Sequence, residues 1–325
     1  MRARIIGTGS YTPPRRMINA DFEKIVDTSD EWIVSRTGIR ERRIADDDMT
    51  TSDMAVQAVQ RALEMARCTH EDIDALIVGT VTPDYKVPST ACVIQEKMGM
   101  PNAVAFDNLA ACAGFLNGLS IARSFIECGV YRKIVVVGVE KLSSITNYKD
   151  RNTCVLFGDA AGAAVVAPDD SGAGILSTFM KSAGSLRELL WIPVGGTRNP
   201  YSRENALNGS DKLRMSGSDV FKVAVREMCT SALKVVDDAG LERKDIALVV
   251  PHQANIRIID ALTKRLGVGS DKVYVNIDMY GNTSSASVPL ALDEANRSGR
   301  IKPGDHVVMV AFGGGLIWGS ALVRW

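Results

Sequence analysis

The sequence predicts an α/β protein made of two similar halves. Helical stretches with apolar residues three and four positions apart alternate with short apolar runs such as residues 74–79, a pattern typical of α/β units. The second half repeats the first: an offset of 170 residues places Asn282 on Cys112 and Gly299 on Gly129. We therefore expect halves at residues 1–170 and 171–325, with an active site where their corresponding loops meet.

In the first half, Thr51, Ser52 and Asp53 are expected to cap a helix that runs to about residue 66 on helical apolar spacing. The other elements are predicted from apolar runs bounded by glycines and polar turns. They are strands at 2–9, 74–80 and 133–138, helices at 89–99 and from Cys112 to about 128, and a glycine-rich segment at 153–167.

In the second half, Ser218 and Asp219 are expected to cap a long amphipathic helix. An apolar strand ends directly before His252, and its pattern at 241–252 matches that of residues 71–78. The remaining elements are a helix after His252, a strand at 273–276, a small-residue helix from about Asn282 to 298, a strand at 306–310 and the glycines 313–315.

Composition argues against several classes of function. Lys and Arg number 38, as do Asp and Glu, so the net charge is zero and we expect no nucleic-acid partner. The six cysteines are scattered and form no CxxC, which argues against a zinc site or a disulfide framework. No apolar run approaches the ~18 residues that span a bilayer, and the first residues show no signal-peptide pattern. We expect a cytoplasmic protein with no metal and no membrane partner.

Cys112 stands among small residues between a polar turn and a helical run. At a helix N-terminus, unpaired N–H groups and the helix dipole would lower the pKa of its thiol and favour the thiolate. A buried, inert cysteine is an equally open interpretation of this stretch alone.

Two further polar residues stand at loop ends. His252 directly follows a buried strand, where a polar residue needs a reason, and Asn282 occupies the repeat position of Cys112. A cysteine and a histidine at corresponding loop ends suit nucleophilic catalysis, although His252 could also be a satisfied core residue. The glycines 313–315 could bring backbone N–H groups close to a reacting oxygen, or form only a tight turn.

The chain resembles the β-ketoacyl-acyl carrier protein synthase III family, which has the thiolase-like fold. The resemblance extends from residue 7 to the C-terminus and implies two duplicated halves in five layers, α-β-α-β-α. It rests on the stretches GTGSYTP, DTSDEWIVSRTGIRER, AACAGF, FGDAAGAAV, VPHQANIRI, GNTSSASVP and AFGGGLIWGSALVRW.

The resemblance implies that Cys112, His252 and Asn282 form the family's catalytic triad. Cys112 would take an acyl group from an acyl-coenzyme A, which is a substrate, so no cofactor is expected. His252 and Asn282 would then stabilise the enolate formed as malonyl-acyl carrier protein loses carbon dioxide. The backbone N–H groups of Cys112 and Gly314 would form the oxyanion hole.

The same resemblance assigns the binding residues. Trp32 among arginines suits either an adenine stack or a solvated helix face, and the resemblance favours the stack. Expected coenzyme A contacts are Thr28, Trp32, Arg36, Arg151, Gly217 and Asn255. The basic residues expected to dock the acidic carrier protein are Lys222, Arg257, Lys264 and Arg265, the last two of which could equally be a solvated face.

Two positions depart from the family pattern. Val87 stands where the acetyl-primed member has a larger aromatic that closes the acyl pocket across a homodimer, so we expect tolerance of longer or branched primers. Residues 195–210 form a longer polar segment, expected to be a surface loop. A secondary-metabolite acyltransferase or ketide synthase on the same fold is the alternative function, and a non-catalytic scaffold would not need all of the triad.

Overall fold

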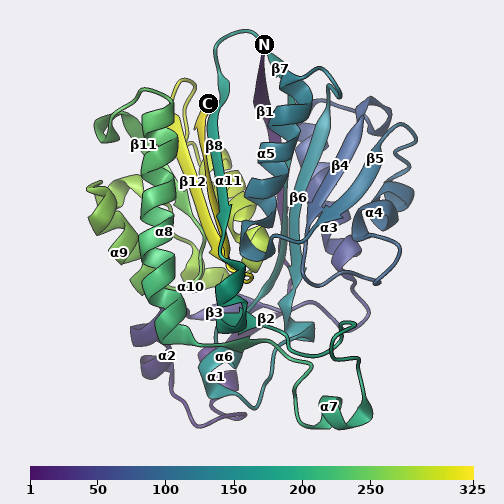
Figure 1. Cartoon of the computed structure of the whole chain (residues 1–325), viewed down its shortest axis with the longest axis vertical. Coiled ribbons are helices and arrows are strands. Elements are labelled where there is room, and N and C mark those ends of the chain that lie inside the picture. Colours follow the sequence, from purple (N-terminus) through teal and green to yellow (C-terminus); the bar gives the residue numbers. More distant parts are fainter.

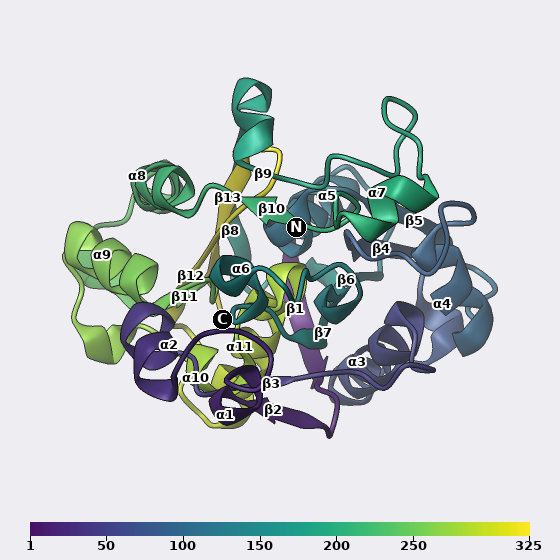
Figure 2. The same ribbon diagram turned by 90° about the horizontal axis from the view of Figure 1, so that it is seen from below.

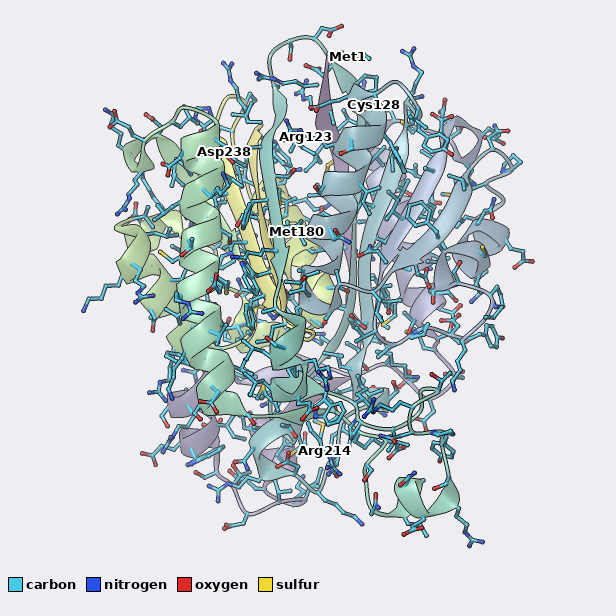
Figure 3. The ribbon with its side chains drawn as sticks, in the orientation of Figure 1. Met1, Arg123, Cys128, Met180, Arg214 and Asp238 are labelled. Atoms are coloured by element: carbon cyan, nitrogen blue, oxygen red, sulfur yellow. The ribbon has the colours of Figure 1, made fainter.

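The computed structural model describes residues 1–325 and has five layers, in the order helix, sheet, helix, sheet, helix (Figure 1). A central apolar cluster of 27 buried residues joins both sheets to the two helices between them. Figure 3 shows the side chains between the layers, among them Met180, which packs against this cluster. The predicted α/β class and layered fold are confirmed. The central helices are α5 (Gly114–Glu127) and α11 (Ser287–Arg297), and the outer ones are α3 (Thr51–Ala66), α4 (Thr90–Met98), α8 (Gly217–Asp238) and α9 (Ile256–Leu266).

The two sheets share one strand order. The first runs β1-β7-β6-β4-β5 and the second β8-β13-β12-β11, so each later strand takes the place of its counterpart. We propose that the halves divide at residues 170/171, between β7 and β8. The strands are β1 (Arg2–Tyr11), β4 (Ala75–Gly79), β5 (Val104–Asn108), β6 (Ile134–Lys141), β7 (Asp159–Asp169), β8 (Gly174–Ser182), β11 (Ile246–Pro251), β12 (His306–Gly313) and β13 (Ile317–Arg324).

The prediction of a strand at 273–276 is wrong. Only Val273 pairs with the sheet, in an isolated bridge to Val249. The Gln253 side chain makes hydrogen bonds with this segment where a neighbouring strand would otherwise do so. Its amide accepts from the Asn276 N–H (3.1 Å) and donates to the Tyr274 carbonyl (3.1 Å). A side chain therefore satisfies backbone groups that a strand partner would otherwise bind.

The internal repeat has a different offset at the active-site turns. A left-handed residue opens the short 3-10 helix before each central helix, Ala111 (φ 44°) in one half and Ser284 (φ 48°) in the other. The offset there is 173 residues (from 111 to 284), so Cys112 corresponds to Ser285 and not to Asn282. The 170-residue offset holds only after the helices, at Gly129 and Gly299, because α5 has 14 residues and α11 has 11.

Helix starts differ slightly from the expected caps. Thr50 caps α3 and forms a reciprocal capping box with Asp53. The long helix α8 begins at Gly217, and its N-cap Ser216 makes no side-chain cap bond, so the predicted capping by Ser218 is wrong.

Short elements gather at one end of the layers (Figure 2). One helix in this set, α7, lies inside the 195–210 segment, which is therefore not only a loop, and stands out from the body (Figure 1). No helix has the length and apolar character needed to cross a membrane. The short elements are β2 (Arg16–Ile18), α1 (Asn19–Phe22), α2 (Asp30–Thr37), β3 (Glu41–Arg43), α6 (Arg151–Cys154), β9 (Leu190–Trp191), α7 (Arg203–Leu207), β10 (Arg214–Met215) and α10 (Ile277–Tyr280).

Candidate active site

Cys112 lies in a 3-10 turn, Ala111–Ala113, directly before the central helix α5. The glycine at 313 brings β12 against this turn, since a Cβ there would lie 2.5 Å from the Cys112 nitrogen. The backbone N–H groups of Cys112 and Gly314 face the sulfur. The turn therefore presents one thiol to two donors at the point where the halves meet.

Burial, not the helix dipole, has the largest effect on the pKa of the Cys112 thiol in this structure. Desolvation raises the pKa of Cys112 to about 12, and the nearby Glu140 adds to the rise, while the Ser284 hydroxyl and the two N–H groups oppose it. The predicted lowering of this pKa is therefore wrong for the free protein. The thiolate must be stabilised as the reaction proceeds.

His252 follows β11 and is buried, with 2% of its surface exposed. Burial lowers its pKa to about 3, so the imidazole is neutral. Its Nδ1 lies 2.6 Å from the hydroxyl of Ser287 at the start of α11. This hydroxyl has no other hydrogen-bond partner, so we infer that it donates to Nδ1, which leaves the proton on Nε2 as a donor.

Asn282 is fixed through its backbone and through one side of its amide. Its N–H donates to the Leu156 carbonyl (2.8 Å), and its own carbonyl accepts from the Gly158 N–H (3.0 Å). The side-chain oxygen accepts from the Ser284 N–H (2.9 Å). The amide NH₂ is therefore the group left to donate into the site.

The structure brings the three predicted catalytic residues together. Cys112, His252 and Asn282 all line one pocket of about 740 Å³, which also reaches Trp32 and the start of α9. Other predicted binding residues on its wall are Arg36, Gly217, Lys222, Asn255 and Arg257. Asn255 also caps α9 and donates to the Arg36 carbonyl (3.1 Å), so it ties two walls of the pocket together.

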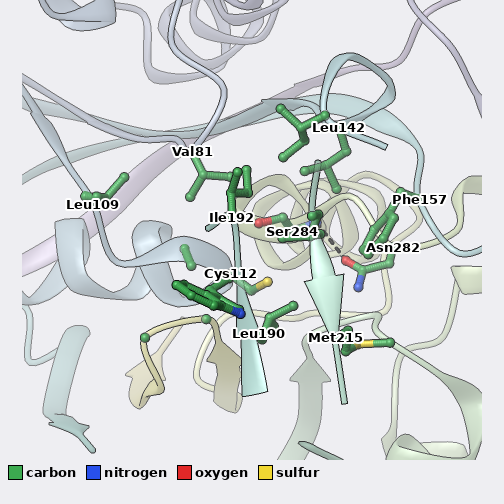
Figure 4. Close-up of a pocket in the computed structure, with 16 residues that line it drawn as sticks. Val81, Leu109, Cys112, Leu142, Phe157, Leu190, Ile192, Met215, Asn282 and Ser284 are labelled. Atoms are coloured by element: carbon green, nitrogen blue, oxygen red, sulfur yellow. Dashed lines mark hydrogen bonds between the residues drawn. The ribbon is translucent and has the colours of Figure 1, made fainter. Parts of the chain in front are cut away.

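A second pocket of about 370 Å³ is also lined by Cys112 (Figure 4). Twelve of its sixteen lining residues are hydrophobic. The paired strands β9 and β10, which lie on either side of the 195–210 segment in the sequence, contribute Leu190, Trp191 and Met215 to its wall. Sequence reasoning missed this wall, because two-residue strands carry no periodic pattern.

Trp32 and Arg151 are in contact. The Arg151 guanidinium lies 4.4 Å from the Trp32 ring centroid, and that of Arg36 lies 5.8 Å away. A base stacked between the two faces needs roughly 7 Å, twice a normal contact distance, so Arg151 must move to admit one. Thr28 and Arg151 do not line the large pocket, but each has a buried polar atom without a hydrogen-bond partner.

Besides Thr28 and Arg151, three predicted residues line neither pocket. Lys264 and Arg265 are exposed on the last turn of α9, farther along the helix than Arg257. Val87 is 87% exposed on the loop between β4 and α4 and does not reach Cys112 of its own chain. No group of three or more His, Cys, Asp or Glu side chains is arranged to hold a metal ion.

The duplicated layers and the cysteine, histidine and asparagine at their junction define a thiolase-like condensing enzyme. The family models 3-oxoacyl-[acyl-carrier-protein (ACP)] synthase III and its C-terminal part match residues 106–184 and 236–325. Relatives named beta-ketoacyl-[acyl-carrier-protein] synthase III are 53% identical in Caldanaerobacter subterraneus (99% of this chain, 98% of the relative) and 52% in Clostridioides difficile (100% and 98%). The chain belongs to the β-ketoacyl-[acyl-carrier-protein] synthase III family.

Solved structures agree with this assignment. The 3-oxoacyl-[acyl-carrier-protein] synthase III of Aquifex aeolicus superposes with a TM-score of 0.93 at 47% identity, covering 99% of this chain and 100% of that one. The priming beta-ketosynthase of the R1128 polyketide pathway superposes with a TM-score of 0.92 at 39% identity, covering 99% and 96%.

Proposed function

We propose that this enzyme condenses an acyl group from acyl-coenzyme A with malonyl-acyl carrier protein, with loss of carbon dioxide, and so initiates fatty acid synthesis. The product is a 3-oxoacyl-acyl carrier protein. The observation that carries the proposal is the meeting of Cys112, His252 and Asn282 at the end of one deep pocket, with an apolar pocket beside the thiol.

In the first half-reaction the Cys112 sulfur attacks the thioester carbonyl, and coenzyme A leaves as the thiol after taking the cysteine proton. The carbonyl oxygen gains negative charge in the tetrahedral intermediate. The N–H groups of Cys112 and Gly314, which already face the sulfur, are placed to hold that oxygen. Loss of one such donor typically raises the barrier by roughly 3–4 kcal/mol.

In the second half-reaction the malonyl thioester loses carbon dioxide and leaves an enolate. His252 Nε2 and the Asn282 amide NH₂ are the free donors of the site, and both are neutral. They stabilise the enolate oxygen without a proton transfer of their own. The enolate carbon then attacks the acyl group on Cys112 and releases the thiolate.

The large pocket suits a phosphopantetheine arm, shared by both substrates. Trp32, Arg36 and Arg151 would bind the adenine and phosphates of coenzyme A, with Thr28, Gly217 and Asn255 along the arm. Lys222 and Arg257 at the pocket, with Lys264 and Arg265 farther along α9, offer positive charge to an acidic carrier protein.

A homodimer would complete the site. β5 is an edge strand, and its outer edge pairs with no other strand of this chain. Val104 on this strand is 41% exposed and Leu109, which lines the apolar pocket, is 82% exposed. A second copy paired along β5 would cover these residues and bring the partner subunit's Val87 towards the pocket. Light scattering on Val104→Lys tests this, because a charge at the edge should yield monomers.

The test of the catalytic assignment separates the two half-reactions. Cys112→Ser should acquire no acyl mass from acyl-coenzyme A in intact-protein mass spectrometry. His252→Ala and Asn282→Ala should still be acylated but release no carbon dioxide from malonyl-acyl carrier protein. Equal loss of both half-reactions in the last two variants would contradict this division of roles.

A ketide synthase of secondary metabolism would use the same chemistry with another carrier. The R1128 priming ketosynthase shares 39% identity with this chain, against 53% for the synthase III relative, so the fatty acid assignment is the better supported.

A further inference from the structure

Glu140 is a buried carboxylate near Cys112 for which the mechanism above has no use. It lies in β6 and has no exposed surface. One side accepts from the β4 loop, through the Val81 N–H (3.0 Å) and the hydroxyls of Thr80 (3.2 Å) and Thr82 (2.8 Å). The other side faces the turn after Asn282, which belongs to the opposite half of the chain.

Two serines of that turn lie against the carboxylate oxygen Oε1. The Ser284 hydroxyl is 3.1 Å away and the Ser285 hydroxyl 3.0 Å away. Ser285 also lies 2.7 Å from the Gly79 carbonyl, which can only accept. Its single hydrogen is therefore shared between that carbonyl and Oε1. Burial raises the pKa of Glu140 to about 7, while the hydrogen bonds from Thr82, the Val81 N–H and the two serines oppose the rise.

Ser284 lies between Glu140 and the active-site thiol. Its hydroxyl lies 3.1 Å from Oε1 and faces the pocket that Cys112 also lines, where it favours the thiolate that the Glu140 charge opposes. Figure 4 shows the Ser284 and Cys112 side chains among those that line the apolar pocket. A serine has one hydrogen to donate, so these two demands on it compete.

We propose that Glu140 and Ser284 are positioning residues that set the reactivity of Cys112, because the single Ser284 hydrogen is shared between the carboxylate and the sulfur. When Glu140 is ionised, its charge opposes the thiolate and Oε1 draws the hydrogen away. When Glu140 is neutral, both effects disappear and Ser284 is free to donate to the sulfur. The inference rests on the proposed role of Cys112 as the nucleophile.

The groups that face the Glu140 carboxylate do not titrate in this pH range. From the β4 loop they are a backbone N–H and two threonine hydroxyls, and from the opposite turn two serine hydroxyls. Cys112 is the ionisable side chain that the charge affects. The neighbouring Lys141 side chain donates instead to the backbone carbonyls of residues 46, 47 and 49.

The experiment measures alkylation of Cys112 by iodoacetamide from pH 5.5 to 9, followed by peptide mass spectrometry, in wild type, Glu140→Gln and Ser284→Ala. In wild type the rate should rise less than tenfold per pH unit around pH 7, where Glu140 ionises. Glu140→Gln should match wild type within about twofold at pH 5.5 and react about tenfold faster at pH 8.5, one unit of thiol pKa. Ser284→Ala should react about tenfold more slowly than wild type at low pH, where Glu140 is neutral. In the double variant, the rate increase caused by Glu140→Gln should be smaller than in the wild-type background.

Asp159→Asn is the matched control. Asp159 is another buried carboxylate, held by Ser143 and the Ala45 N–H, and its hydrogen bonds do not reach Ser284 or Cys112. This variant should keep the wild-type profile. A wild-type profile that is linear through pH 7, or a Glu140→Gln profile equal to wild type, would overturn the inference. Wild type needs no substitution to fold, so its profile decides even where a variant is unstable.

Acylation on the same samples keeps the two proposals apart. If acyl-coenzyme A leaves no acyl mass on Cys112 of wild type, the proposed function fails. If acylation is normal and the alkylation profiles do not respond to Glu140, only this inference fails.

Discussion

The apolar pocket beside Cys112 predicts that the enzyme prefers primers longer than acetyl. Its volume of about 370 Å³ far exceeds what a methyl group fills, and its walls are mostly hydrophobic. Each methylene moved from water into such a wall contributes about 0.8 kcal/mol, roughly fourfold in a rate ratio. For 3-methylbutanoyl-coenzyme A, with three more carbons than acetyl-coenzyme A, the upper bound on the gain in kcat/KM is about 60-fold.

The assay is single-turnover acylation of Cys112, followed by intact-protein mass spectrometry with acetyl-, butanoyl- and 3-methylbutanoyl-coenzyme A. Ile145→Phe adds volume to the pocket wall and should reduce the preference for the two longer primers. It should leave acetyl transfer within about twofold of wild type, because the wall and not the thiol has changed. Ile25→Phe, at an exposed site outside the pocket, is the matched control.

Equal rates for the three primers, or a preference for acetyl, would refute this reasoning. Such a result would mean that another group fills the space during acylation. In the proposed homodimer, Val87 of the partner subunit is the first residue to examine in that case, with Val87→Ala expected to restore the longer primers.

Three further predictions concern the same site. Since burial lowers the pKa of His252 to about 3, decarboxylation of malonyl-acyl carrier protein should show no titration between pH 5 and 7, and an inflection near pH 6.5 would contradict a neutral imidazole. Gly313→Ala should lower acylation at least ~100-fold while circular dichroism stays unchanged, because the new Cβ would lie 2.5 Å from the Cys112 nitrogen. Lys264→Glu should raise KM for the carrier protein and not for acyl-coenzyme A, whereas Lys234→Glu on α8 should change neither, and an equal rise for both substrates would count against docking at α9.

Much of the fold follows from local patterns. The α3 and β4 stretches have strong periodicity or continuous apolar character, and the structure places them within a residue or two of the expected ranges. The segment 273–276 has a similar apolar character, but the Gln253 amide takes its backbone groups. A bond from a side chain 21 residues away leaves no signal in the local sequence.

The candidate site, like the fold, is predicted from the sequence only in part. Motif spacing predicts that Cys112, His252 and Asn282 meet, because each follows a strand or turn at the same edge of the fold. It does not predict that Ser285, and not Asn282, is the structural counterpart of Cys112. That correspondence depends on the different lengths of α5 and α11, which only the three-dimensional positions of the left-handed residues reveal.

The direction of the Cys112 pKa has a consequence for how the site works. The same burial that raises the thiol pKa lowers that of His252, so the resting site holds neither a thiolate nor an imidazolium. Its donors are nevertheless already aimed: two N–H groups at the sulfur, and an amide and an imidazole N–H towards the pocket. Charge forms only as the thioester is attacked or the malonyl group loses carbon dioxide, and it then meets dipoles that need no reorganisation. Burial therefore disfavours the charged ground state while the fixed donors favour the charged transition state, and that difference accelerates the reaction.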